Sequence, residues 1–265
     1  MWFDVYLGLW AFVVGACVGS FAHVLVMRMP ADISLWKRSM SPCCHRQLAW
    51  YENIPLLSFL FLRGRCRYCD AKISWRYPIF ELIFGCLFTY MMSVHGLGLP
   101  FFSYAIFTTL LIVIGYIDFQ FYIMPLSLLV IIILSGLLFH AFNGSLQDSF
   151  FGVILGFLVL FIVLVVFTFV LRKTGRLQKH EYAMGIGDPL MLSGIGAFLG
   201  FQAIPIVIFI SAFLGVVFGF IFLIRPHTEK EIPKYAIPYG PFLACAAIVF
   251  LLYKPFFMAF ILRGI

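Results

Sequence analysis

Residues 150–171 read FFGVILGFLVLFIVLVVFTFVL, a continuous apolar run without one charged side chain. A helix of about 20 apolar residues spans the hydrocarbon core of a bilayer, so this run predicts a transmembrane helix. The whole chain has the same character, since 63% of its 265 residues are hydrophobic and 11% are charged. Soluble domains carry about 25% charged residues. We therefore expect an all-α polytopic membrane protein, because only helices and closed barrels satisfy their backbone in lipid.

Eight stretches are long and apolar enough to be transmembrane helices. The sixth and seventh are separated only weakly, between Gly200 and Pro205, so seven spans is the alternative. The first stretch does not read as a cleaved signal peptide, because no Lys or Arg precedes it and no small-residue cleavage site follows it. The predicted spans are residues 5–27, 79–95, 101–117, 125–142, 150–171, 189–204, 205–224 and 239–258.

The distribution of positive charge predicts how the chain is oriented. Residues 28–78 hold nine Lys and Arg, residues 172–188 hold four and residues 225–238 hold three, whereas the alternate connections hold none. Basic connections stay in the cytoplasm, which places both termini in the periplasm and requires an even number of spans. That result favours eight spans over seven.

Three domains follow from this topology: a first transmembrane helix (1–27), a cytosolic cysteine-containing domain (28–78) and a transmembrane core (79–265). The net charge of +7 is explained by topology and by attraction to anionic lipid heads. We expect no nucleic-acid partner, because no basic and aromatic surface module is visible.

Two acidic residues at the ends of predicted spans are candidate catalytic groups. Asp118 ends the third span and Asp188 opens the sixth, after Gly185 and Gly187, so both are expected at the cytoplasmic face. An ionisable group at bilayer depth is costly and marks a functional candidate. Two such carboxyls held close together share a proton, which is aspartyl protease chemistry. The structural alternative is that Asp188 caps a helix that starts at Pro189 and that Asp118 marks the membrane boundary.

The loop of residues 28–78 carries a candidate metal site. Cys66 and Cys69 form a CxxC pair, and Cys43 and Cys44 lie upstream. Disulfides are rare in the reducing cytosol, and thiolates at this spacing suit a structural tetrahedral zinc knuckle. The alternative is a reduced loop without metal. The remaining cysteines lie in predicted spans and read as ordinary small apolar residues: Cys17, Cys86 and Cys245.

These features occur together with short motifs along nearly the whole chain, and the set resembles the type IV prepilin peptidases, also called prepilin leader peptidase/N-methyltransferases. Asp118 with Pro125 and the Gly185-Ile186-Gly187-Asp188 segment resemble the two catalytic segments of these GxGD-type intramembrane aspartyl proteases. The other matching motifs are Gly19-Ser20-Phe21, Arg28-Met29-Pro30, Trp50 to Pro55, Arg63 to Cys66, Cys69, Arg76-Tyr77-Pro78 with Glu81, and Ile237 to Ala244.

The resemblance implies a reaction and a place for it. Such enzymes cut the short basic leader from type IV prepilins and type II secretion pseudopilins, at the cytoplasmic side of the bacterial inner membrane. Those with the large cytosolic domain also methylate the new N-terminus with S-adenosylmethionine. Asp118 and Asp188 would be the catalytic pair.

Four residues depart from the family pattern. Ser41 stands where the first metal cysteine is expected, so Cys43, or else His45, would complete the site. Leu126 and Leu190 replace polar residues, and His23 replaces an Asn. None of these changes removes a candidate catalytic carboxylate.

Several acids outside the catalytic pair are candidates for contact with the substrate. A carboxylate can pair with an ammonium group, so Glu52 and Glu81 are candidate substrate or methylation residues. The alternative is that Glu81 caps the second span and Glu52 orients the loop. Glu229 and Glu231 are candidates to receive the basic leader, or they are solvated loop charges.

Two other classes of function stay open at this point. The protein could be a proton-coupled transporter with Asp118 and Asp188 as relay groups. It could instead be a membrane methyltransferase or assembly factor with an inactive protease site. The sequence leaves the oligomeric state undetermined.

Overall fold

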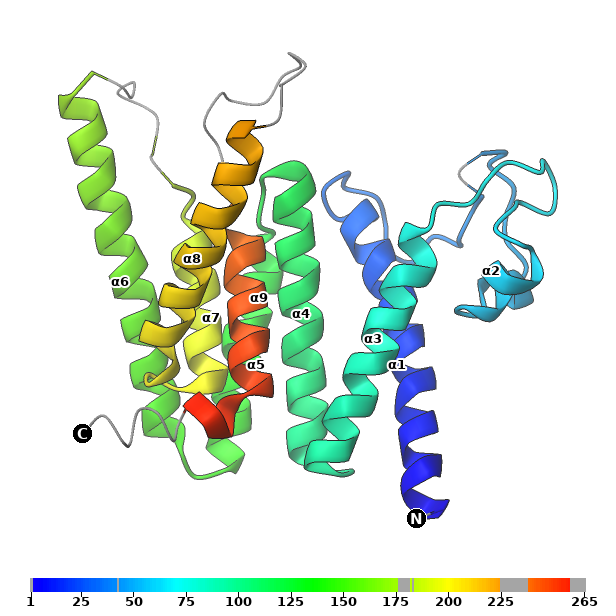
Figure 1. Ribbon diagram of the computed structural model, residues 1–265, viewed down its shortest axis with the longest axis horizontal. Helices are drawn as coiled ribbons and strands as arrows, with labels where there is room; N and C mark the ends of the chain where they lie inside the picture. The colour runs from blue at the N-terminus through cyan, green and yellow to red at the C-terminus, as the bar shows by residue number, and fades with distance from the viewer. Residues whose placement is uncertain (1, 42, 176–181, 183, 225–237, 258–265) are drawn as a thin grey trace. The chain divides into compact units, whose positions relative to one another are not determined.

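The computed structural model describes residues 2–41, 43–175, 182, 184–224 and 238–257 (Figure 1). In this part of the chain the regular secondary structure is entirely helical, with two isolated β-bridges and no strand. The elements are α1 (Trp2–Arg28), η1 (Trp50–Asn53), α2 (Leu57–Phe61), α3 (Arg76–His95), α4 (Leu99–Phe121), α5 (Leu126–Phe142), α6 (Leu146–Lys173), α7 (Gly187–Leu199), α8 (Ala203–Ile224) and α9 (Gly240–Leu252).

Five of these helices are long and apolar enough to cross a membrane, namely α1, α3, α4, α6 and α8, while α5 and α9 are shorter apolar helices. The prediction of an all-α polytopic membrane protein is confirmed at this level. Each of the eight predicted stretches overlaps one main helix, and the sixth also includes the first two residues of α8. Two of the three basic connections used to predict the orientation, residues 172–188 and 225–238, lie partly outside the described residues, because 176–181 and 225–237 are not described.

The weak boundary between the sixth and seventh stretches is a real helix break. Gly200 follows α7 with a φ of +82°, in the left-handed region that glycine adopts without steric cost. Its amide donates to the carbonyl of Gly196, and α8 begins three residues later at Ala203. Pro205 lies in the first turn of α8, where a proline removes no intrahelical hydrogen bond.

The chain divides into two compact units, Met1–Thr109 and Leu110–Ile265, and the division falls within α4. In the first unit α1 packs along α3. A side chain at Gly19 would meet the carbonyl oxygen of Phe80 at 2.9 Å, and one at Gly15 would meet that of Phe84 at 2.5 Å. Small residues four apart let two helix backbones approach closely, which is how apolar helices associate in lipid.

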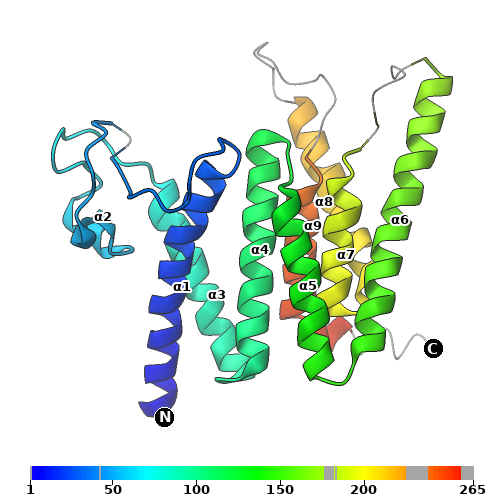
Figure 2. The ribbon, with the colours of Figure 1, turned by 180° about the vertical axis from the view of Figure 1, so that it is seen from behind.

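In the second unit α7 is the central helix, with α5, α6, α8 and α9 packed around it (Figures 1 and 2). Every residue from Asp188 to Leu199 is buried except Leu190. The closest approach is between Gly152 of α6 and Gly196 of α7, where each α-carbon faces the other residue's backbone and a methyl group on either would overlap a carbonyl oxygen. Because α7 has no face left for lipid, its position is set by its neighbours.

Side chains hold the C-terminal end of α7. The hydroxyl of Ser149 donates to the carbonyl of Ala197 at 2.7 Å, and Nε2 of His140 lies 3.0 Å from the carbonyl of Phe198. A carbonyl only accepts, so Nε2 carries the hydrogen and Nδ1 accepts from Ser145 at 2.6 Å. These bonds satisfy carbonyls at the last turn of the helix, which have no intrahelical partner.

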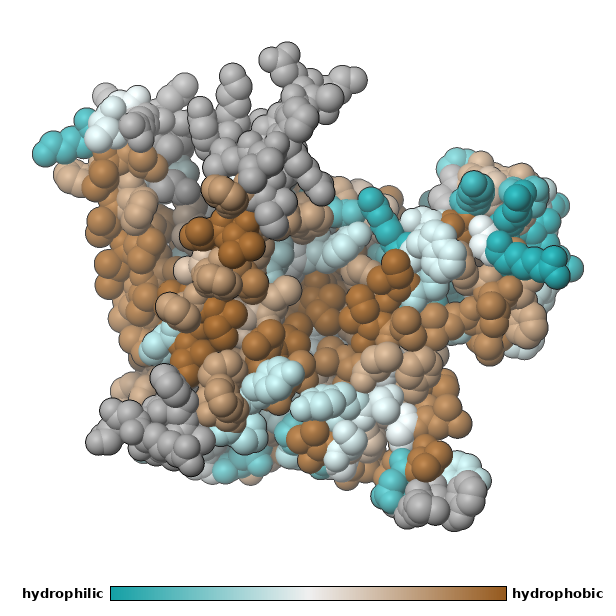
Figure 3. All heavy atoms as spheres, viewed as in Figure 1, coloured by the Kyte–Doolittle hydropathy of each residue, from teal (hydrophilic) through white to brown (hydrophobic). Residues whose placement is uncertain are grey.

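The outer surface of α6 is apolar along its length. Large side chains such as Ile162, Phe167 and Phe169 are exposed, and Figure 3 shows this helix as a nearly continuous hydrophobic band. Such a surface is unfavourable in water and favourable in contact with lipid. The long helix α6 and the short helix α7 therefore differ in role, because α6 exposes an apolar surface suited to lipid and α7 is enclosed by protein.

Replacing Gly152 with alanine tests the close contact of α6 and α7. The added methyl group would overlap the Gly196 backbone, and overpacking of this kind costs about 1–3 kcal/mol. We expect Gly152→Ala to lower the thermal unfolding temperature of the purified protein in detergent. Gly215→Ala is the matched control, because a methyl group there would make only ordinary contacts at 3.7 Å or more. Equal stability of the two variants would contradict this packing.

Candidate functional site

Asp118 lies on α4, three residues before the end of the helix, and its side chain is buried. Its Oδ2 accepts a hydrogen bond of 3.0 Å from the backbone N–H of Gly240, the first residue of α9. A side chain at Gly240 would lie 2.8 Å from that same oxygen, so only glycine lets the backbone donor reach it. The carboxyl of Asp118 is therefore oriented by the start of another helix.

Asp188 is the second residue of α7, and its side chain is also buried. The helix begins at Gly187 with Ile186 as the capping residue, and no side chain caps it. The interpretation of Asp188 as a helix cap before Pro189 is therefore wrong. Its Oδ1 makes no hydrogen bond with the described residues. Buried polar atoms are almost always bonded, so this oxygen is available to a substrate or a water molecule.

The two carboxyl groups come together in the second unit, where they are close enough for their charges to interact. Met124, in the connection from α4 to α5, packs against Gly187, which precedes Asp188, and against Gly240, whose amide binds Asp118. A side chain at Gly187 would lie 2.8 Å from its Sδ, and one at Gly240 would lie 2.6 Å from its Cε. Gly187 thus permits close approach of this connection. A side chain at Gly185 would make only ordinary contacts, the nearest with Oδ2 of Asp188 at 3.8 Å.

Sequence reasoning did not single out three residues of this site: Met124, Tyr239 and Gly240. The hydroxyl of Tyr239 lies 2.6 Å from that of Ser211 on α8, and Tyr239 also interacts electrostatically with Asp188. The family motif around Tyr239, Gly240 and Pro241 was the sequence feature that could have indicated them. Sequence spacing could not show that this motif contacts Asp118, because Gly240 and Asp118 are 122 residues apart in the chain.

A pair of buried carboxyls from separate helices can act as an acid and a base. When two carboxyls interact in a site of low dielectric, one ionises more readily than the other. The ionised carboxylate can take a proton from water, and the protonated one can donate a hydrogen bond to a carbonyl oxygen. The geometry of Asp118 and Asp188 is thus compatible with peptide hydrolysis.

The four predicted cysteines gather in the first unit. The sulfurs of Cys43, Cys44, Cys66 and Cys69 all lie within 4.8 Å of one another, a cluster that could hold a metal ion. Two tight turns present them. In one, the amide of His45 donates to the carbonyl of Ser41, and in the other the amide of Asp70 donates to that of Cys66. His45 itself does not join the cluster.

The electrostatics of these thiols favour a bound cation. A hydrogen bond from Ser41, with backbone N–H groups of Tyr68 and Cys69, lowers the pKa of the Cys66 thiol to about 6. Ser41 likewise lowers the pKa of Cys44. Hydrogen bonding to the Cys43 sulfur instead raises the pKa of Cys69 to about 12. Sulfurs this close share protons when they are alone, and a divalent cation would replace those protons.

Glu52 and Glu81 are both buried and both bind backbone amides. Oε2 of Glu52 accepts from the amide of Ala49 at 2.9 Å, and its Oε1 lies 3.9 Å from the guanidinium of Arg67. Oε2 of Glu81 accepts from the amide of Leu56 at 2.7 Å, and Ser20 also hydrogen-bonds this carboxyl. Each carboxylate therefore fixes part of the segment between α1 and α3. Glu229 and Glu231 lie outside the described residues.

Comparison with known proteins covers nearly the whole chain. Residues 13–95 match the Bacterial Peptidase A24 N-terminal domain, and residues 105–220 match the Type IV leader peptidase family. No solved structure matches the chain.

Three curated relatives carry the name prepilin leader peptidase/N-methyltransferase. The protein from Myxococcus xanthus (strain DK1622) is 36% identical over 237 residues, which cover 86% of this chain and 68% of the relative. The Aeromonas hydrophila protein is 33% identical over 270 residues, covering 91% and 89%. The Klebsiella pneumoniae protein is 37% identical over 207 residues, covering 75% and 87%.

Identity at this level extends through the segments that carry both the cysteine cluster and the buried aspartates. The chain belongs to the type IV leader peptidase family.

Proposed function

We propose that this protein is an endopeptidase that removes the leader of type IV prepilins or type II secretion pseudopilins, and that it then methylates the new N-terminus. One observation carries the peptidase assignment: two buried carboxyls, Asp118 on α4 and Asp188 on α7, interact in a member of this family. The names of the relatives support both activities.

In this proposal one carboxyl acts as the base and the other as the acid in hydrolysis. The ionised carboxylate takes a proton from a water molecule, whose oxygen attacks the carbonyl carbon of the scissile bond. The protonated carboxyl donates a hydrogen bond to the carbonyl oxygen as negative charge develops there. The C–N bond then breaks, and the amine leaves with a proton returned by the dyad. Asp118 is held for this role by the amide of Gly240.

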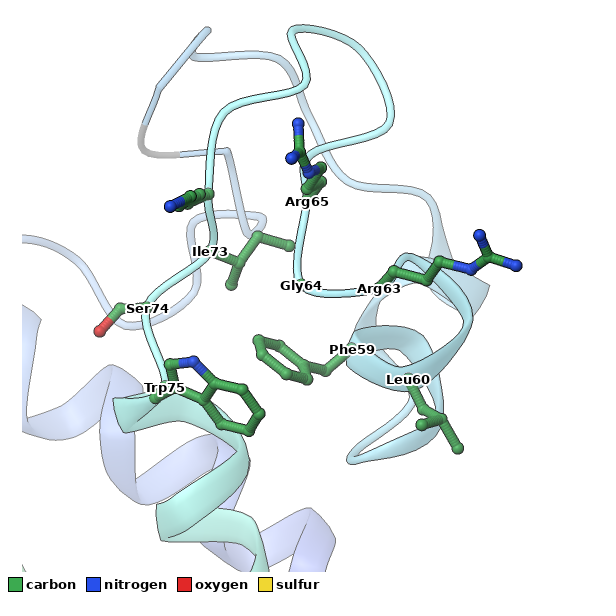
Figure 4. Close-up of a pocket in the computed structure, with 9 residues that line it drawn as sticks. Phe59, Leu60, Arg63, Gly64, Arg65, Ile73, Ser74 and Trp75 are labelled. Atoms are coloured by element: carbon green, nitrogen blue, oxygen red, sulfur yellow. The ribbon is translucent and has the colours of Figure 1, made fainter.

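Methylation belongs to the proposal through the family and the names of the relatives. S-adenosylmethionine would supply the methyl group: its S–CH₃ bond would break as the N–C bond forms, S-adenosylhomocysteine would leave, and the new N-terminal amine would lose a proton. One hollow of about 690 Å³ in the first unit is bordered by Arg63, Arg65 and Lys72 (Figure 4). Its positive charge is a poor fit to a sulfonium cation, so we do not assign the methyl donor to it.

The proposed topology has eight spans with both termini in the periplasm, in the bacterial inner membrane. The charge asymmetry supports it, as do the five long apolar helices and the helix in each remaining stretch. Under this topology residues 28–78 form a cytosolic domain between a first transmembrane helix and the transmembrane core. The lipid bilayer and a prepilin are the partners.

We further propose that the cysteine cluster holds zinc. Four sulfurs with Cys43 as the fourth member match a tetrahedral Cys₄ site, which in other proteins is structural. Zinc would crosslink the two turns that present the cysteines, and the chain's own hydrogen bonds to Cys66 stabilise the thiolate form that a metal requires.

Asparagine at either aspartate tests the dyad. Asp118→Asn and Asp188→Asn remove the ionisable group and keep the shape, so each should lower the rate of leader cleavage by about 100-fold or more. The double variant should be little worse than either single one, because the residues act as a unit. The measurement is the cleavage of a purified prepilin in membranes, followed by mass spectrometry.

Asp148→Asn is the matched control, because Asp148 is an exposed acid in the first turn of α6. It should keep normal cleavage. If Asp118→Asn or Asp188→Asn cleaves at the control's rate, the dyad is wrong and the transporter hypothesis gains support.

Metal analysis tests the cysteine cluster. The purified protein should contain about one zinc per chain, and Cys43→Ser should reduce zinc affinity because the fourth thiolate is lost. Cys86→Ser, on the apolar helix α3, should keep the full zinc content. A wild-type protein prepared with protection from chelators that still contains no zinc would exclude the site.

Glutamine at Glu52 or Glu81 tests whether the cytosolic segment serves methylation. Both carboxylates position this segment, and neither lies in the unit that contains Asp118 and Asp188. We therefore expect Glu52→Gln and Glu81→Gln to reduce N-methylation more than leader cleavage. Mass spectrometry of the mature pilin N-terminus reports both activities, and Asp70→Asn, at an exposed acid, is the control. Equal loss of both activities would count against the separation.

A further inference from the structure

The short helix α2 is tied to the side of the candidate span α3. The carboxylate of Glu81 accepts from the amide of Leu56, the residue directly before α2. Glu81 lies five residues after Arg76, the first residue of α3, which is about 8 Å along the helix axis. The start of α2 is therefore held well past the point where α3 begins, in the direction in which α3 enters the membrane.

The other side of α2 is anchored to the first turn of α3. A tight turn reverses the chain after α2, with Gly64 at a φ of +68° and its carbonyl accepting from Ile73 at 2.8 Å. This turn brings the ring of Phe59 against that of Trp75, the capping residue of α3, with centroids 4.8 Å apart (Figure 4). Tryptophan is enriched at the membrane–water interface. Both attachments thus hold α2 beside the first turns of α3, which is interfacial depth if α3 crosses the membrane.

Large apolar side chains of α2 remain uncovered at this depth. Leu57 is 50% exposed, Leu60 is 71% exposed and Phe61 is 81% exposed. Figure 4 shows Leu60 at the lower border of the hollow, on the side toward which α3 continues from Trp75. In Figure 3 the surface of this loop is hydrophilic on its upper side and hydrophobic on its lower side, toward which α3 runs. Three neighbouring side chains of this kind would be unfavourable in water.

Basic groups border the same element. Arg63 lies two residues after the end of α2, and both Arg63 and Lys72 line the hollow that Figure 4 draws. Arg65 is paired with Asp70 at 2.7 Å, but neither Arg63 nor Lys72 has an acidic partner in the part of the chain that the structure describes. A pair of uncompensated cations beside an exposed apolar helix is complementary to anionic lipid headgroups above acyl chains.

We propose that α2 is an interfacial anchor for the loop that carries the cysteine cluster. Leu57, Leu60 and Phe61 enter the bilayer surface beside α3, and Arg63 and Lys72 bind the phosphates of anionic phospholipids. The occupant of this surface is thus the membrane itself. The anchor restricts how far the cysteine-containing loop can move from the spans, because both ends of α2 are fixed.

Photocrosslinking in lipid nanodiscs tests the anchor. The photoreactive amino acid p-benzoylphenylalanine is placed at Phe61 in the full chain, and the nanodiscs contain equal amounts of phosphatidylcholine and phosphatidylglycerol. The exposed Phe167 of α6 is the lipid-facing reference, and Tyr68, between Cys66 and Cys69, is the aromatic control in the same loop. After illumination, mass spectrometry counts the lipid adducts at each position.

We expect adducts at position 61 at a yield close to that at 167 and several-fold above that at 68. Phosphatidylglycerol should exceed phosphatidylcholine among them, and Arg63→Gln with Lys72→Gln should bring the two lipids to equal yield. A yield at 61 no higher than at 68, or crosslinks to a second copy of the chain, would overturn the anchor. A lipid ratio unchanged by the double variant would overturn the headgroup site. Neither measurement uses a prepilin, so the result is independent of the proposed function.

Discussion

The architecture of the second unit depends on the contact between the backbones of α6 and α7 at Gly152 and Gly196. Apolar helices in lipid gain little from burying hydrocarbon, so close packing and hydrogen bonding must hold them together. This contact packs the long, lipid-facing helix α6 against the short helix α7, which is buried on almost all sides. With α7 held in place, Asp188 at its first turn lies at a defined position inside the protein rather than in lipid.

The buried acids follow one rule, which is that a polar group removed from water needs a partner. Asp118 has the amide of Gly240, Glu81 has that of Leu56, and Glu52 has that of Ala49. Asp188 differs, because its Oδ1 has neither a hydrogen bond nor a nearby cation among the described residues, whereas the unbonded Oε1 of Glu52 lies 3.9 Å from the guanidinium of Arg67. A carboxyl that is buried, interacts with a second carboxyl and keeps an open oxygen is suited to chemistry, whereas the glutamates are suited to holding a loop.

The first unit combines a cysteine cluster with an amphipathic loop on one pair of membrane helices. The turn that follows α2 connects the two features, since Gly64 lies at its start and Cys66 two residues further on. The same short stretch of chain thus presents a sulfur ligand on one side and the aromatic contact of Phe59 with Trp75 on the other. If α2 rests on the bilayer and the cysteine cluster holds zinc, the membrane and the metal constrain the same loop at two neighbouring points.

The sequence by itself determined where the helices lie, because a span of lipid imposes a length and a composition that are local properties of the chain. It also identified Asp118, Asp188 and the cysteines, since charged groups and thiols stand out in an apolar chain. Only the tertiary structure decided which groups meet. It placed the amide of Gly240 on Asp118, the amide of Leu56 on Glu81, and Cys43 rather than His45 with the other sulfurs. It also showed that Asp188 is not the helix cap that the sequence allowed but a buried residue inside the first turn of α7. Such pairings join residues far apart along the chain, and a close approach between helices depends on the packing of every helix around them.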